Sequence, residues 1–306
     1  MNSVWLVCTV LTTLLWGFAE LFYKKGARRD EPYSHLKICV FVGAVMGMHA
    51  ILTLCTQKIG YDPVNLIRYL PVSFCYILSM ALSYFGMRYI EESISDPIEN
   101  TSGALCSILC AVFLGARISR GSAAAILLIV GGILGIGFLE HRGETDRTRK
   151  LGKKLALVAF AMPFCYAILD ALGSFLDVYY LEMETSPLLN VTEETIEEVA
   201  NVSYELTFAL VALILFLFMK RRKVALDLPR QLDKVLAAVF ETAGQFTYVY
   251  AMSGNGAIAA PIISSVCVVS LLLSRVFLKE KLTGKQYFFI ALVLIGILTL
   301  AVIEGE

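Results

Sequence analysis

The stretch "VFLGARIS", residues 112–119, has a counterpart in "VFLKEKLT", residues 276–283, and the pair marks an internal repeat. When residues 84–140 are laid over residues 248–304 without a gap, 14 of 57 positions are identical. Weak internal similarity of this kind indicates that one structural unit occurs twice. The repeat predicts two halves, residues 1–140 and 151–306.

Apolar composition indicates that the chain lies in a membrane. Of its 306 residues, 58% are hydrophobic and 17% are charged, and the mean hydropathy is +0.72. The apolar runs repeatedly reach the roughly 20 residues that a helix needs to cross a bilayer, and they lack the two-residue alternation of barrel strands. We therefore expect an all-α integral membrane protein without a soluble domain. Ten transmembrane helices are expected near residues 3–23, 37–57, 68–89, 95–114, 121–139, 154–180, 202–219, 235–253, 258–278 and 286–303.

Basic residues are sorted between the two sides of this arrangement. Alternate connections, beginning with the one between the first two spans, carry 21 of the 26 Lys and Arg residues, and the remaining loops carry four. By the positive-inside rule the basic connections are cytoplasmic, which places both termini outside. An odd number of spans in each half then gives two five-helix repeats of inverted topology. Such repeats are typical of proteins that expose a midplane site to each side in turn.

Several motifs carry a resemblance to a known family. They are "WG" in the first span, Pro97 and Pro261 at the start of spans four and nine, and "FLKEKLTGKQYFFIALVLIGIL" (277–298). With the ten-span pattern, they resemble the EamA-like family of the drug/metabolite transporter (DMT) superfamily over nearly the whole chain. The family-typical Glu280 is matched by Ala116 in the first half, so the function of Glu280 is not duplicated. The resemblance implies a transporter without a bound cofactor, but family members carry amino acids, cationic metabolites, sugars or drugs.

The stretch "AAVFETAGQFTYVYAM" (237–252) contains the strongest site candidate, Glu241. Gln245 lies four residues later and Tyr248 follows about one further turn along, so the three share a helical face. A carboxylate, an amide and an aromatic ring on one stripe suit a cavity better than lipid. The alternative is a structural Glu that is bonded to a neighbouring helix.

A second group of candidates comes from matching "WGFAE" (16–20) to "YAILD" (166–170). The match pairs Glu20 with Asp170 and Trp16 with Tyr166, and in inverted halves these residues approach the interface from opposite sides. Lys24, four residues after Glu20, offers that carboxylate an ordinary ion pair. Asp170 has no such basic neighbour in sequence, which favours a functional role for it.

Three further polar residues have ordinary structural alternatives. "DPIE" (96–99) fits a capped helix start, in which Glu99 closes a capping box, although Glu99 and Asn100 could also line a cavity. His49 in the second span could take part in a proton relay or simply be hydrogen-bonded within the bundle.

The candidate site is rich in acidic and aromatic side chains, which favours an organic cation or amine-bearing metabolite as substrate. A buried carboxyl could also load and release protons, and competition between a proton and a cation gives antiport, so we expect a proton-coupled exporter in a cell membrane. A facilitator or exporter of neutral amino acids or other metabolites, without proton coupling, is the alternative. A non-transporting sensor or scaffold is a hypothesis of another class.

The sequence contains no hydrolase, metalloprotease or metal-binding motif, and we expect no enzyme activity, cofactor, metal or nucleic-acid partner.

Overall fold

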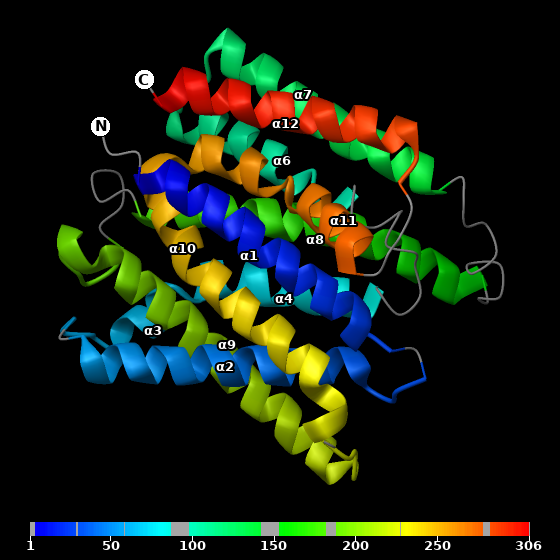
Figure 1. Cartoon of the computed structure of the whole chain (residues 1–306). Helices are drawn as coiled ribbons and strands as arrows, with labels where there is room; N and C mark the ends of the chain where they lie inside the picture. Colours follow the sequence, from blue (N-terminus) through cyan, green and yellow to red (C-terminus); the bar gives the residue numbers. More distant parts are fainter. Residues whose placement is uncertain are drawn as a thin grey trace.

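The structure, a computed structural model, describes residues 4–28, 30–57, 59–86, 98–141, 153–181, 188–226, 228–277 and 282–305. Every regular element in these ranges is helical (Figure 1). The α-helices are α1 (Val4–Gly26), α2 (Ser34–Thr56), α3 (Val64–Arg68), α4 (Leu70–Gly86), α6 (Ser102–Leu109), α7 (Arg120–His141), α8 (Lys153–Leu181), α9 (Ile196–Arg221), α10 (Leu232–Ile263), α11 (Val266–Phe277) and α12 (Gly284–Gly305). Short π and 3-10 turns cover Cys110–Leu114, Glu193–Thr195 and Leu228–Gln231.

Long apolar helices dominate the fold and account for its class. Five of the described helices are long and apolar enough to cross a membrane, and a bent pair that includes α10 and α11 raises the number to six. Helices α4, α6 and the apolar part of α7 are shorter. Residues 87–97, which include the end of predicted span three and the start of predicted span four, lie outside the described part. The prediction of an all-α multi-pass membrane protein is confirmed, whereas the number of ten spans stays a prediction.

Two of the predicted spans, the fourth and the ninth, are not continuous helices. In predicted span four the helix gives way to a turn at Asn100 and Thr101 before α6 begins. In predicted span nine a turn at Ser264 and Ser265 separates α10 from α11. Asn100 and Ser264 are equivalent in the sequence repeat. Both interruptions differ from the continuous helices that hydropathy predicted, because hydropathy measures apolar content and not backbone dihedrals.

Helix α10 also contains the connection between predicted spans eight and nine. Asn255 lies inside this helix with non-helical dihedrals of φ −163° and ψ 69°. The chain turns back at this end of α10, so that its last segment runs beside α1 in Figure 1.

The main helix pairs join the two halves of the chain. Helix α1 packs on α10 and α11, and α8 packs in the same way on α4 and α6. Helix α2 packs on α9, and α7 packs on α12. In the last pair the repeat-matched Gly132 and Gly296 permit close approach, because a Cβ on either would lie within 3 Å of a backbone carbonyl oxygen of the facing helix.

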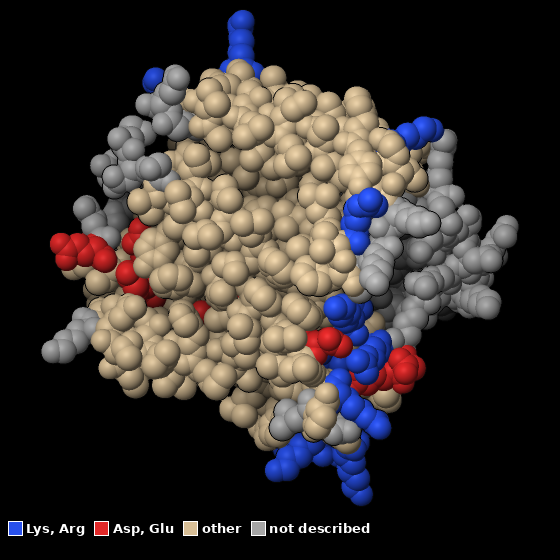
Figure 2. All heavy atoms as spheres, viewed as in Figure 1, with Lys and Arg blue, Asp and Glu red and all other residues tan. Residues whose placement is uncertain are grey.

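Basic side chains gather at one end of the bundle. In Figure 2 they concentrate at the right and lower right, together with some acidic groups, whereas the charged groups visible on the left are mainly acidic. The two termini lie at the same end of the bundle in Figure 1.

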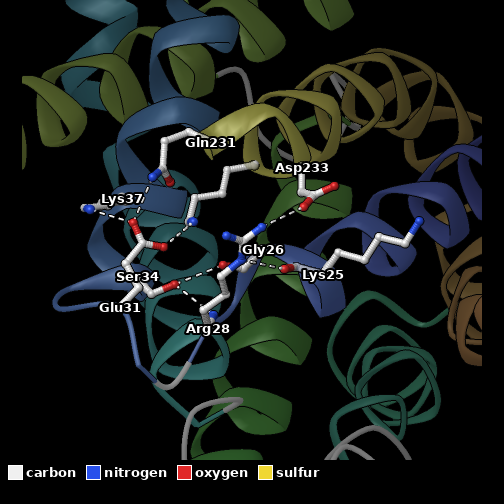
Figure 3. A network of polar contacts seen from close by, with 9 residues as sticks. Lys25, Gly26, Arg28, Glu31, Ser34, Lys37, Gln231 and Asp233 are labelled. Atoms are coloured by element: carbon white, nitrogen blue, oxygen red, sulfur yellow. Dashed lines mark hydrogen bonds and ion pairs between the residues drawn. The ribbon is translucent and has the colours of Figure 1, made fainter. Parts of the chain in front are cut away.

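At the basic end, a network of ion pairs ties the connection between α1 and α2 to the start of α10 (Figure 3). Glu31 accepts hydrogen bonds from Lys234 at 2.7 Å, Gln231 at 2.8 Å and Lys37 at 2.5 Å. Arg28 pairs with Asp233 at 3.3 Å. Partial burial raises the pKa of Glu31, but the hydrogen bonds from Lys234, Lys37 and Gln231 outweigh that effect and lower it to about 2.

Candidate functional site

A cavity of about 130 Å³ lies among α1, α4, α6, α8, α9, α10 and α11. Nine of the ten side chains that the sequence singled out line it, and His49 does not. The nine are Trp16, Glu20, Glu99, Asn100, Tyr166, Asp170, Glu241, Gln245 and Tyr248. The other lining residues are Tyr23, Lys24, Tyr76, Met80, Ser83, Ser102, Gly103, Ser174, Tyr204, Ala260, Ile263, Ser264 and Val266.

Helix α10 carries Glu241 to the contact with α1. The side chain is buried, and the Tyr23 hydroxyl donates to its Oε2 atom at 3.2 Å. Tyr84 in turn donates to the Tyr23 hydroxyl at 2.9 Å. The indole of Trp16, two turns before Tyr23 on α1, donates to the Glu241 backbone carbonyl at 3.2 Å, which gives α1 a second contact with this residue of α10.

Aromatic rings and hydroxyl groups form another wall of the cavity. The Trp16 ring stacks on Tyr248 with 5.0 Å between the ring centroids. The hydroxyl oxygens of Tyr248 and Tyr76 lie 2.5 Å apart, and both groups donate to Ser174 Oγ, at 3.0 and 3.2 Å. Tyr204 meets the Tyr76 ring edge to face. Side chains from α4 and α10 therefore converge on the Ser174 hydroxyl group of α8.

The remaining carboxylates reach the cavity from three different segments. Asp170, on α8, lines the cavity together with Ser102 and Tyr166. Glu99 accepts a hydrogen bond from Ser83 at 2.8 Å. Glu20 and Lys24 line the same cavity. The expected cap residues Asp96 and Pro97 lie outside the described residues, as does Glu280.

His49 lies between α2 and α9, away from the cavity. Its Nδ1 atom is 2.8 Å from both carboxylate oxygens of Glu205, and its ring meets Phe246 edge to face. Glu205 has no exposed surface. Sequence analysis missed Glu205 as the partner of this histidine, because the two are 156 positions apart.

Sequence analysis also missed Tyr23 and the face of α4 that carries Tyr76, Met80 and Ser83. The last three recur at positions i, i+4 and i+7, which is the spacing of one helical face, and two of them are polar. That periodicity was a usable signal. The sequence offered no comparable signal for Tyr23, because this residue follows Phe22 and precedes Lys24 and Lys25, as an aromatic residue at the end of a membrane span often does.

The lining is acidic overall. Among the described lining residues, four carry carboxyl groups and one carries an amine. Within the described part of the chain, no group of three or more His, Cys, Asp or Glu side chains is arranged to hold a metal ion.

Comparison with known proteins agrees with this membrane architecture. The profile of the EamA-like transporter family matches residues 3–138 and 185–302. Curated protein sequences give no significant match. Among 28 matching chains of solved structures, one whose title reads only "Crystal structure of protein" is 13% identical and has a TM-score of 0.73. The match covers 99% of this chain and 98% of that one, and at this identity it shows the shared fold alone. The chain therefore belongs to the EamA-like transporter family.

Proposed function

We propose that the protein exports an organic cation or amine-bearing metabolite in exchange for protons, by alternating access. The observation that carries this proposal is the composition of the cavity. Among its described lining residues, carboxyl groups outnumber amines four to one. A cation that enters the cavity loses hydration, and these carboxylates offset that loss.

Aromatic groups support the same substrate class. Trp16, Tyr248 and Tyr76 form contiguous ring contacts beside Glu241 and Asp170. An ammonium group over an aromatic face gains about 0.5–2 kcal/mol when it is desolvated. Met80 adds a soft apolar surface for the carbon skeleton of the substrate.

Proton coupling follows from the position of Glu241. Its side chain is buried beside a tyrosine hydroxyl, and a negative charge there requires a compensating group. Either a proton or a cationic substrate can supply that compensation. If both cannot bind together, each crossing of the cation is exchanged for a proton, which is antiport.

Alternating access is supported by the way the halves pack. The relation of α1 to α10 and α11 is repeated by α8 with α4 and α6, as expected for two inverted five-helix repeats spanning residues 1–140 and 151–306. Ten spans in a cell membrane, with both termini outside, are consistent with the gathering of basic groups at one end of the bundle in Figure 2.

A ligand screen by thermal shift tests the substrate class. The purified protein would be heated with primary amines, quaternary ammonium compounds, neutral amino acids and sugars at two pH values. We expect amines to raise the Tm, and to do so less at the lower pH because protons compete for the carboxylates. The Glu241→Gln variant should lose this stabilisation, whereas Glu194→Gln, which changes an exposed glutamate, should keep it. Stabilisation by neutral amino acids alone would favour the uncoupled facilitator instead.

A further inference from the structure

Asp177 is a buried carboxyl group that lies beyond the cavity along α8. It follows Ser174 by three residues and Asp170 by seven, so the three share one helical face. Its side chain has no exposed surface, and the Tyr69 hydroxyl donates to its Oδ1 atom. Its Oδ2 atom is buried and has no hydrogen-bond partner among the described residues.

The groups around Asp177 are acidic or neutral. The titratable groups that face it are Tyr69 from the turn between α3 and α4, Tyr76 from α4, Cys106 from α6, Tyr204 from α9 and Tyr248 from α10, with Asp170 on α8 itself. In the described part of the chain no Lys, Arg or His forms an ion pair with it. A buried carboxylate without a counter-charge is strongly disfavoured, and a proton on Oδ2 removes the charge.

A metal cation does not fit this position. Hard cations take about six or more oxygen ligands, whereas Asp177 and Tyr69 supply only a carboxyl and a phenol. The ligand that these two groups can hold is a proton.

Polar groups extend from Asp177 in both directions. Toward the cavity, Ser174 lies one turn away and is bonded to Tyr76 and Tyr248. Away from the cavity, the Tyr69 backbone N–H donates to the backbone carbonyl oxygen of Asn65. The Asn65 side chain exchanges hydrogen bonds with the backbone of Asn190.

The column of polar residues that runs from Asp177 through Tyr69, Asn65 and Asn190 to Asp62 ends at the surface. Asn190 donates to Asp62 at 2.7 Å, in the connection between α2 and α3. Hydrogen bonds from the backbone of Val64 and from Asn190 lower the pKa of Asp62, so the outer end of the column carries a negative charge at neutral pH.

We propose that Asp177 is a second proton-binding site, distinct from Glu241, which exchanges its proton between the cavity and the Asp62 end of the column. In the step itself the Oδ2–H bond breaks, its electron pair stays on the carboxylate, and a water molecule accepts the proton. The role in coupling rests on the proposed proton exchange, although the protonation of Asp177 can be measured without any substrate.

Infrared spectroscopy of the purified full chain tests the site directly. The C=O stretch of a protonated carboxylic acid is separate from the bands of ionised carboxylates and shifts in D2O. We expect Asp177→Asn to lose one such band that is present at neutral pH in the wild type. Asp30→Asn, which changes an exposed aspartate, should keep it. A spectrum of Asp177→Asn that is unchanged from wild type would overturn the assignment.

Tyr69→Phe provides a test that keeps the carboxyl group. Removing the hydroxyl that donates to Oδ1 should shift the Asp177 band without abolishing it, and an unshifted band would contradict the proposal. An ionised Asp177 would give no protonated band to shift.

Two combinations of results separate this proposal from the proposed function. If the Asp177 band is present but no amine raises the Tm, the substrate class is wrong and the proton site stands. If amines bind while the band is absent, the proton site is wrong and the cation transporter stands.

Discussion

Glu241 lies on α10, and its carboxylate receives a hydrogen bond from Tyr23 on α1, 218 positions away. The sequence indicated the stripe of Glu241, Gln245 and Tyr248 because helical periodicity is local. It could not indicate Tyr23, because the distance between two helices depends on how they pack. The same holds for Ser174, four residues after Asp170, whose hydroxyl accepts hydrogen bonds from Tyr76 and Tyr248 on two other helices.

We predict that Glu241→Gln abolishes coupling and leaves the fold intact. The amide oxygen can still accept the Tyr23 hydrogen bond, so the free energy of unfolding should change by no more than about 1 kcal/mol. The amide cannot exchange a proton, so uptake driven by a pH gradient should fall at least about tenfold, equivalent to about 1.4 kcal/mol.

Uptake into proteoliposomes of the amine that gives the largest thermal shift provides the measurement. Glu194→Gln serves as the matched control, because it makes the same chemical change at an exposed position. Undiminished pH-driven transport by Glu241→Gln would remove Glu241 from the proton pathway.

At the scale of elements, the interruptions at Asn100–Thr101 and Ser264–Ser265 are the features that hydropathy missed. They bring α6 and the last part of α10 together, where the Gly103 N–H donates to Ser264 Oγ at 3.1 Å. A Cβ on Gly103 would lie 2.3 Å from the Ala260 carbonyl oxygen, so only glycine allows this approach. Both residues line the cavity, which indicates that the interruptions shape it.

The ion-pair network that joins the α1–α2 connection to α10 yields a prediction about pH. The folded-state pKa of Glu31, about 2, lies below its ordinary value of 4.5. Its ionised form therefore stabilises the fold fully above about pH 4.5, and this contribution is lost as the pH falls toward 2.

We expect Glu31→Gln to lower the free energy of unfolding by about 3 kcal/mol at neutral pH, because it leaves the buried Lys234 amine without its carboxylate. The difference from wild type should shrink between pH 4.5 and pH 2. Thermal unfolding across this pH range measures the effect, and Asp30→Asn, an exposed neighbour, should match wild type. A wild-type Tm for Glu31→Gln at neutral pH would show that the network contributes no stability.

At the scale of the whole molecule, the two halves are interleaved. Helices α1 and α2 pack chiefly on α10 and α9, and α7 packs on α12, so neither half forms a separate body. The central cavity is lined by residues of both halves. Movement of one repeat against the other would therefore change the cavity directly.

The inverted arrangement predicts opposite exposure for the two ends of α9. With cysteine introduced at Glu194 or at Lys223 in a background where the eight native cysteines are replaced, a membrane-impermeant thiol reagent should label position 194 in intact cells. Position 223 should be labelled only after permeabilisation. The reverse pattern would place both termini inside and overturn the assigned orientation.

By itself, the sequence determined the class of the protein and much of the site's composition. Apolar runs require helices in a bilayer, since backbone polar groups have no other partners there, and helical periodicity marked the polar stripe on α10. The motifs of the repeat likewise indicated the family that the profile match establishes.

Only the tertiary structure decided which polar groups meet. It gathered nine predicted residues around one cavity, paired His49 with Glu205 outside it, and joined Asp177 to Tyr69. These outcomes depend on the rotation and separation of packed helices, and one sequence contains no local signal for either quantity.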